Sequence, residues 1–134
     1  MIRSTHKVMI CGSREYSNLT QLHDFIQTLP QTILIIHGGA AGVDSFAGLI
    51  AKKREIEVKV VEPDWKPNGI YNPRAGFERN KLMVDEADVV VAFWNGVSKG
   101  TLDSITHAVK QDKLFAVYLP SDDLRLPCMR GVKW

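Results

Sequence analysis

The run Val8-Met9-Ile10-Cys11-Gly12-Ser13-Arg14 near the start of the chain decides the fold. Four apolar residues in succession are typical of a strand that is buried on both faces of a parallel sheet. Gly12 closes the run, and Ser13 and the cation Arg14 follow it. The stretch therefore predicts a central strand whose carboxyl end opens into a loop suited to contact with an anion.

Outward from this run, strand-like and helix-like segments alternate. Further strands are predicted at Thr32–Ile36, Glu57–Val61, within Ala87–Trp94, and at Leu114–Leu119. Helices are predicted from Asn18, a capping-box residue paired with Gln21, to the stop at Pro30, and from Asp44 to about Arg54. Two more are predicted from Asn72-Pro73 onward and after Gly100, the last with Leu102, Ile105 and Val109 on one face.

This alternation predicts an α/β fold made of βαβ units with right-handed crossovers. We expect a single Rossmann-like open parallel sheet of about five strands, in the order 3-2-1-4-5, with helices on both faces. One domain fits the whole length of residues 1–134. The tail over residues 120–134 shows no clear pattern.

Two strand-to-helix loops lie at the predicted point of strand-order reversal, between strands one and four. One is Gly12-Ser13-Arg14 and the other is Asn95-Gly96-Val97-Ser98-Lys99-Gly100-Thr101. Glycines, hydroxyls, a cation and a helix start together favour phosphate. The same small residues also serve as ordinary turn and cap residues, but two such loops on one edge favour anion binding.

Three further groups of residues are candidates for the same edge. In the loop His37-Gly38-Gly39-Ala40-Ala41-Gly42-Val43-Asp44, the Asp44 carboxylate either caps a helix or meets a ribose hydroxyl, and His37 is interpreted as structural. Arg79 and Asn80 lie either on a solvated helix face or in the site. The stretch from Pro63 to Pro73 is predicted to be a long functional loop, in which Trp65 either stacks on a base or covers the sheet edge, and Tyr71 is a second ring that can close over a ligand.

Composition gives broad limits on function. Hydrophobic residues make up 45% of the chain and the net charge is only +2, so no extended basic surface for nucleic acid is indicated. We therefore do not expect nucleic acid as a partner. The two cysteines, Cys11 and Cys128, show no spacing of a metal site or a disulfide framework. No signal peptide or membrane-spanning run is visible, so we expect a cytoplasmic protein without a membrane partner.

The motifs also resemble those of the YspA-type branch of the SLOG superfamily, which includes the LOG phosphoribohydrolases, formerly called lysine decarboxylase-like, and DprA. The resemblance runs from about Val8 to Leu119. It rests on Cys11-Gly12-Ser13-Arg14, His37-Gly38-Gly39-Ala40-x-Gly42-x-Asp44, Pro63-Asp64-Trp65, Ala75-Gly76-x-x-Arg79-Asn80-x-x-Met83 and Gly100-Thr101.

The resemblance implies a pocket for nucleotides or nucleotide-derived molecules, and it implies self-association. Residues that match the family's motifs would line the pocket: Gly12, Ser13, Arg14, Gly38, Gly39, Asp44, Arg79, Asn80, Gly100 and Thr101. The LOG enzymes in that resemblance have an Arg-Lys pair on the helix and a glutamate three residues after the threonine of the Gly-Thr pair. Here Asn80 stands at the lysine position and Ser104 at the glutamate position.

Serine cannot supply the carboxylate that stabilises a ribosyl cation, and Asp103 is one residue, or about 100°, out of register. We therefore expect a domain that binds a nucleotide or a related phosphorylated small molecule, as a sensor or sequestering protein. No cofactor is required, although a phosphorylated ligand can bring Mg²⁺. Two alternatives stay open.

The first alternative is hydrolysis of a nucleotide derivative, with Asp44, Asp64 or Asp103 as the acid. The second is DprA-like binding of single-stranded DNA, indicated by the similarity over His37 to Ala47 and by a small tail patch of Arg125, Arg130, Lys133 and Trp134.

Overall fold

Strand β1 (Lys7–Gly12) lies near the middle of one sheet in the computed structural model, which describes residues 2–121 and 125–126. On one side it pairs in parallel with β2 (Leu34–His37), and β2 pairs with β3 (Glu57–Val60). On the other side β1 pairs with β4 (Val89–Phe93), followed by β5 (Leu114–Tyr118). The predicted order 3-2-1-4-5 is confirmed, and the order reverses between β1 and β4.

A short sixth strand, β6 (Arg125–Leu126), extends the sheet at the β5 edge, where it runs antiparallel to β5. It falls in the tail for which the sequence showed no pattern. Cys128, Arg130, Lys133 and Trp134 lie outside the described residues.

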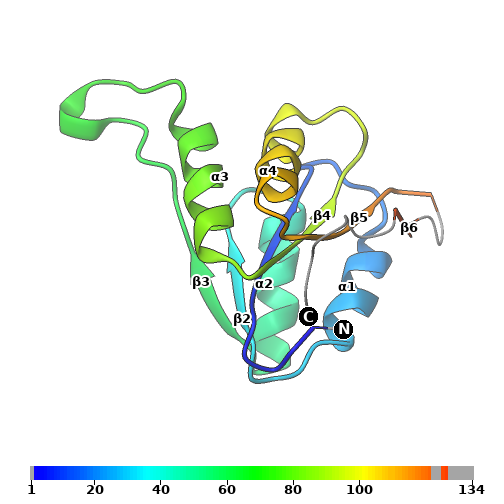
Figure 1. The fold of residues 1–134 in the computed structure, drawn as a ribbon. Helices are drawn as coiled ribbons and strands as arrows, with labels where there is room; N and C mark the ends of the chain where they lie inside the picture. Colours follow the sequence, from blue (N-terminus) through cyan, green and yellow to red (C-terminus); the bar gives the residue numbers. More distant parts are fainter. Residues whose placement is uncertain (1, 122–124, 127–134) are drawn as a thin grey trace.

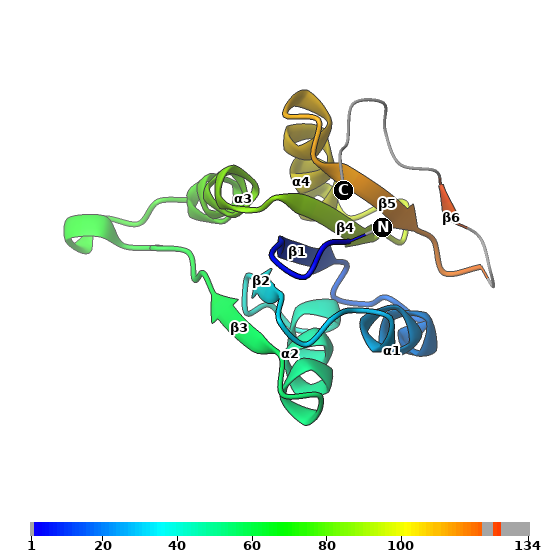
Figure 2. The same ribbon diagram turned by 60° about the horizontal axis from the view of Figure 1, so that its bottom comes forward.

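Helices cover both faces of the sheet (Figures 1 and 2). Helices α1 (Leu19–Gln27) and α2 (Val43–Lys53) lie on one face, and α3 (Ala75–Glu86) and α4 (Lys99–Lys110) lie on the other. Alternate residues of β1 divide between the two layers: Val8 and Ile10 pack in the core under α1 and α2, whereas Met9 and Cys11 pack under α3 and α4. This double burial explains why the strand is apolar without alternation.

Two helices differ from their predicted form. Helix α3 begins at Ala75 rather than at Pro73, because Asn72 and Pro73 form a turn in which the Asn72 side chain accepts a hydrogen bond from the N–H of Arg74 at 3.0 Å. Helix α4 turns a face of small residues, Thr101, Ser104 and Ala108, toward the sheet, while Leu102 and Val109 are exposed. By contrast, Asn18 caps α1 as predicted, accepting from the N–H of Gln21.

The connection from β3 to α3, residues 61–74, projects beyond the body of the molecule (Figure 1). It holds one 3₁₀ turn (Pro67–Gly69). We call this segment the arm. In the described part of the chain, no helix is long and apolar enough to cross a membrane.

Two glycines let the loops at the carboxyl edge of the sheet pack closely. A Cβ atom on Gly12 would lie 2.6 Å from Cβ of Val43 and 2.7 Å from the carbonyl oxygen of Phe93. A Cβ on Gly42 would lie 2.8 Å from the carbonyl carbon of Arg14, and Gly42 has φ +81° and ψ −124°. That backbone region is nearly exclusive to glycine.

Gly42→Ala should therefore destabilise the fold by more than the roughly 1–3 kcal/mol that the backbone conformation alone costs. Gly96→Ala is the matched control, because Gly96 has φ +84° but a Cβ there would meet nothing within 4 Å. Urea unfolding of both variants measures the difference. Equal stabilities for the two variants would contradict the close approach of the loops.

Candidate functional site

The loops after β1 and β4 are joined at the carboxyl edge of the sheet. The N–H of Ser13 donates to the carbonyl oxygen of Phe93 at 3.0 Å, and the Ser13 hydroxyl accepts from the N–H of Asn95 at 3.1 Å. Ser13 is buried. Its side chain thus holds together the two loops that the sequence placed at the point of strand-order reversal.

A cavity of about 500 Å³ opens between these loops, α3 and the arm. Ten of the thirteen predicted site residues line it: Gly12, Ser13, Arg14, Asp44, Trp65, Arg79, Asn80, Ser98, Gly100 and Thr101. Gly38, Gly39 and Lys99 are not among the lining residues. The sequence motifs therefore converge on one cavity, although the binding of a ligand there stays a prediction.

The first turn of α4 faces this cavity. Ser98 caps the helix by accepting from the N–H of Thr101 at 3.3 Å, and the Thr101 hydroxyl donates to the Ser98 hydroxyl at 3.1 Å. Within the described residues, the N–H groups of Lys99 and Gly100 have no hydrogen-bond acceptor. The hydroxyls thus serve the cap, and backbone N–H groups with the helix dipole are left for an anion.

Asp44 holds the loop between β2 and α2 from the first turn of α2. Its Oδ2 accepts from the N–H of Gly38 at 2.9 Å and from the N–H of Ala40 at 3.3 Å. The side chain is buried, and burial raises the pKa of Asp44 to about 6, although both hydrogen bonds and Arg79 oppose the rise. Asp44 both organises its loop and lines the cavity.

Arg79 on α3 also binds the backbone of that region. Its Nη1 donates to the carbonyl oxygens of Gly38 at 2.6 Å and Val61 at 3.3 Å, and its Nε donates to Oδ1 of Asn80 at 3.0 Å. A Cβ on Gly38 would lie 2.7 Å from Cζ of Arg79. Gly38 therefore serves the approach of the guanidinium, which explains why it lies outside the cavity lining.

Asn80 connects α3 to α4. Its Nδ2 donates to the carbonyl oxygen of Gly100 at 3.2 Å and to the carboxylate of Asp103 at 3.3 Å. Oδ1 of Asp103 also lies 3.5 Å from Nε2 of His107. Because Asn80 is buried and the Nε and Nη1 groups of Arg79 donate within the protein, neither residue lies on a solvated helix face.

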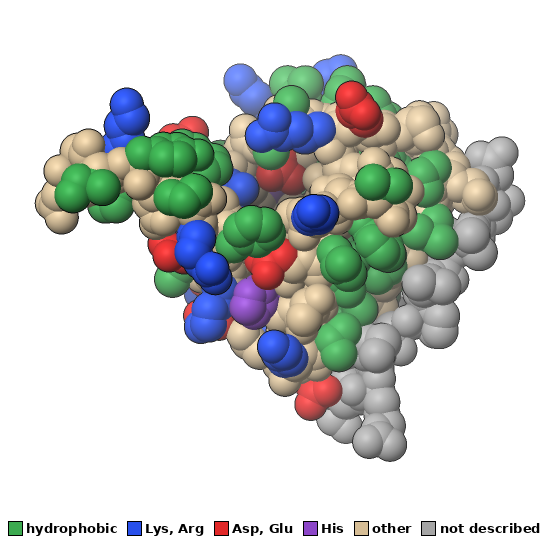
Figure 3. All heavy atoms as spheres, turned by 90° about the horizontal axis from the view of Figure 1, so that it is seen from above, with side chains coloured by type: hydrophobic (Ala, Val, Ile, Leu, Met, Phe, Trp, Pro, Cys, Tyr) green, Lys and Arg blue, Asp and Glu red, His purple; other side chains and the backbone are tan. Residues whose placement is uncertain are grey.

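Arg14 is the cation left for a ligand. It is exposed, lines the cavity, and makes no ion pair within the described part of the chain. Burial lowers the pKa of Arg79, Asp44 opposes that shift, and Arg14 adds to it, so the two guanidinium groups are within electrostatic reach. Figure 3 looks onto this edge, where Lys and Arg side chains stand around a hollow and the arm extends to the left.

Ser104 and Cys11 lie at the floor of the cavity. Ser104, which stands at the glutamate position of the LOG motif, thus lines the cavity. Asp103 is not a lining residue. Burial strongly raises the pKa of the Cys11 thiol. Sequence reasoning did not assign Cys11, Glu15 or Phe77 to the site; Glu15 directly follows the Gly-Ser-Arg loop, and Phe77 falls inside the Ala75–Met83 motif.

Trp65 lies at the cavity, whereas His37 lies outside it. Trp65 lines the cavity and stacks on Tyr71 of the arm, with ring centroids 6.3 Å apart. His37 is buried outside the cavity, where its Nδ1 accepts from the N–H of Gly39, and burial lowers its pKa. This placement agrees with a structural role for His37.

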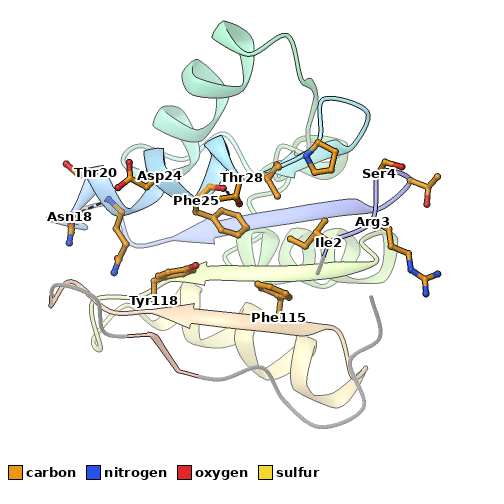
Figure 4. Close-up of a pocket in the computed structure, with 14 residues that line it drawn as sticks. Ile2, Arg3, Ser4, Asn18, Thr20, Asp24, Phe25, Thr28, Phe115 and Tyr118 are labelled. Atoms are coloured by element: carbon orange, nitrogen blue, oxygen red, sulfur yellow. Dashed lines mark hydrogen bonds between the residues drawn. The ribbon is translucent and has the colours of Figure 1, made fainter.

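A second hollow, of about 1530 Å³, lies between the N-terminal segment, α1 and β5 (Figure 4). Phe25, Phe115 and Tyr118 give it an aromatic wall. Arg3 and Asp24 are its charged lining residues, and they are opposite in sign. None of the predicted site residues lines it. Although it is larger, its composition offers less to an anion than the cavity between β1 and β4.

Sequence comparison finds one family model and one phage protein that are similar to the chain. Residues 6–67 match the sequence model of the YspA, cpYpsA-related SLOG family. The Gene 61 protein of Mycobacterium phage D29 is 32% identical over 114 residues, which is 78% of this chain and 89% of that protein.

Solved structures share the fold. DprA from Helicobacter pylori, described for its single-stranded DNA binding mode, matches with a TM-score of 0.64 at 22% identity, covering 84% of this chain and 64% of that one. DprA from Streptococcus pneumoniae matches with a TM-score of 0.72 at 18% identity, covering 83% of this chain and 50% of that one. TM1055 matches with a TM-score of 0.61 at 23% identity, covering 82% of this chain and 72% of that one. The chain thus spans one half to two thirds of the DprA structures, and at these identities the likeness concerns the fold.

The expectation that nucleic acid is not a partner is wrong as it stands. A protein with this fold, H. pylori DprA, binds single-stranded DNA. The expectation rested on the near-neutral net charge of the whole chain, but such a sum says little about one edge of a sheet, where Arg14 lines the cavity without an ion pair among the described residues.

Protonation of Asp44 should stabilise the fold. Because the pKa of Asp44 is raised from 3.8 to about 6, the native state binds the proton more tightly than the unfolded chain. This contribution is fully present below the unfolded pKa and is lost as the pH rises through about 6. Between pH 7.5 and 5 it should add about 1 kcal/mol to the free energy of unfolding.

Urea unfolding of the wild type and of Asp44→Asn at both pH values isolates this contribution. The amide oxygen of Asn can still accept from the N–H of Gly38, but it does not titrate. We expect the gain on acidification to be about 1 kcal/mol larger in the wild type than in the variant. The same pH dependence in both proteins would show that Asp44 titrates normally.

Proposed function

Because the chain belongs to the YspA, cpYpsA-related SLOG family, we propose that its cavity binds a nucleotide or a nucleotide-derived phosphorylated small molecule. The protein would act as a sensor or a sequestering protein for that molecule. In this proposal the ligand's phosphate lies at the first turn of α4, beside Arg14.

The observation that carries this proposal is the arrangement around Gly100. The N–H groups of Lys99 and Gly100 have no acceptor within the described residues, and a Cβ on Gly100 would meet nothing within 4 Å. Arg14, an exposed guanidinium without an ion pair among the described residues, lines the same cavity. Helix N–H groups beside a guanidinium form a characteristic phosphate site.

The size and chemistry of the cavity support the same proposal. A volume of about 500 Å³ lies within the roughly 300–1,000 Å³ typical of small-molecule sites. Its lining combines apolar groups, Met83 and Phe77, with a few polar ones. Asp44 is the buried polar side chain suited to sugar recognition, because its Oδ2 binds the loop N–H groups and its second carboxylate oxygen can accept from a hydroxyl group.

A second candidate function is hydrolysis of the ligand, and Asp44 is the observation in its favour. It is a buried carboxyl group that lines the cavity and has a pKa of about 6, which suits a general acid near neutral pH. Asp64 and Asp103, the other acids considered, are not lining residues. Release of free base from a bound nucleotide, abolished by Asp44→Asn, would establish this function.

Thermal unfolding with a panel of compounds tests the binding function. The panel holds nucleoside mono- and diphosphates, ADP-ribose, cyclic nucleotides, ribose 5-phosphate, pyrophosphate and short single-stranded DNA. A ligand at a hundred times its dissociation constant should stabilise the native state by about 2.7 kcal/mol. We expect Arg14→Ala to reduce the shift, because it removes the guanidinium beside α4.

Arg3→Ala is the matched control, since Arg3 is an exposed arginine at the second hollow. It should leave the thermal shift unchanged. A shift that Arg3→Ala removes and Arg14→Ala does not would place the ligand in the other hollow. A shift with DNA and with none of the small molecules would replace the small-molecule function by DNA binding.

Gly100→Asp should separate stability from binding. Space is open at this position, and a carboxylate in the first turn of a helix stabilises it by about 0.3–1 kcal/mol. The same charge repels a phosphate, so the variant should keep or raise its melting temperature and lose the ligand-induced shift. Gly100→Ala, which adds bulk without charge, should keep most of the shift. Undiminished binding by Gly100→Asp would contradict a phosphate at this helix end.

A further inference from the structure

The arm has a defined conformation. The N–H of Asn72 donates to the carbonyl oxygen of Trp65 at 2.6 Å, which closes the arm at its base, and a 3₁₀ turn over Pro67–Gly69 shapes its tip. The Asn72 side chain fastens the arm to α3, since its Nδ2 donates to Glu78 at 2.8 Å. A segment held in this way presents its side chains without a large ordering cost on binding.

Aromatic rings continue from the cavity onto the arm. Trp65 and Phe77 both line the cavity, with 44% and 42% of their surfaces exposed. Tyr71, 61% exposed, is not a lining residue; it stacks on Trp65 with an interplanar angle of 14°. Trp65 also reaches α3, because a Cβ on Gly76 would lie 3.4 Å from its ring. We call Trp65, Tyr71 and Phe77 the aromatic shelf.

The two ends of the site offer different groups to a ligand. Within the arm, the carboxylates of Glu62 and Asp64 balance the cations Lys66 and Arg74, so the arm has no net charge. At the α4 end, Arg14 and Gly100 line the cavity, and the N–H of Gly100 has no acceptor within the described residues. A phosphate is therefore favoured at α4, whereas a flat uncharged ring suits the aromatic shelf.

We propose that the aromatic shelf binds the base of the ligand, so that a nucleotide lies across the cavity with its base against Trp65 and its phosphate at Gly100. Trp65 is then a specificity-determining residue: it selects nucleotides over phosphorylated sugars. This inference rests on the proposed phosphate site at α4. The nucleotide can be free or can belong to a single strand, since the chemistry at the shelf is the same.

Comparison of nucleotides with ribose 5-phosphate tests the shelf. The dissociation constants of AMP, GMP, CMP, UMP and ribose 5-phosphate are measured by calorimetry for the wild type, Trp65→Ala and Ile70→Ala. The best nucleotide should bind about 5- to 150-fold more tightly than ribose 5-phosphate, the range expected for one stacked base. Trp65→Ala should remove this advantage and leave the affinity for ribose 5-phosphate unchanged.

Ile70→Ala is the matched control, because Ile70 is an exposed apolar residue of the same arm that does not line the cavity. It should keep the advantage. Trp65→Phe, which keeps a ring, should lose only part of it, and melting without ligand checks that each variant folds. Replacing AMP by a pentamer of deoxyadenosine identifies the source: tighter binding that also depends on Trp65 indicates a single strand, and weaker binding indicates the free nucleotide.

Two results overturn the inference in different ways. Equal affinities for ribose 5-phosphate and for every nucleotide would remove the shelf as a base site while leaving the phosphate site intact. Equal weakening of both classes by Trp65→Ala would also overturn it. If no phosphorylated probe, including pyrophosphate, binds the wild type, the proposed function itself fails.

Discussion

The Arg79 guanidinium organises the carboxyl edge of the sheet. From α3 it reaches the carbonyl oxygens at the ends of β2 and of β3, and through Asn80 it is connected to the start of α4. Four elements are thus fixed by one side chain and its neighbour. Asp44 completes the arrangement by binding the N–H groups of the same loop whose carbonyl oxygen Arg79 binds. The negative charge of Asp44 also favours the half-buried guanidinium of Arg79.

This constraint divides the polar residues of the site into two groups. Ser13, Ser98, Arg79 and Asn80 use their polar atoms within the protein, where they hold loops and helix starts in place. Arg14, the first-turn N–H groups of α4, and the exposed rings of Trp65 and Phe77 are available to a ligand. The internal hydrogen bonds of the first group fix the positions of the second group, which is the arrangement that preorganised recognition requires.

Local pattern was sufficient for the fold but only partly for the site. The apolar runs identified the strands, and Asn18 identified the start of α1, because these signals act over a few residues. The loops that converge were also predictable, since parallel strands end at one edge. The role of Arg79 was not, because its acceptors at Gly38 and Val61 are 41 and 18 residues away in sequence.

Two sequence-based expectations failed for related physical reasons. Of Leu102, Ile105 and Val109 on one face of α4, only Ile105 packs against the core, and the buried residues of the helix are Thr101, Ser104 and Ala108. The near-neutral charge of the chain was taken to exclude nucleic acid, but charge acts through its local distribution. In both cases the tertiary arrangement decides what neither a local spacing nor a sum over the sequence shows.

The central claim is that the start of α4 holds a phosphate, and backbone NMR tests it most directly. Adding AMP or pyrophosphate to ¹⁵N-labelled protein should shift the amide signals of Lys99 and Gly100 most, because their N–H groups would gain a charged acceptor. The amides of Arg3 and Thr20 at the second hollow should not move. Shifts confined to that hollow, with Lys99 and Gly100 unchanged at saturation, would contradict the account.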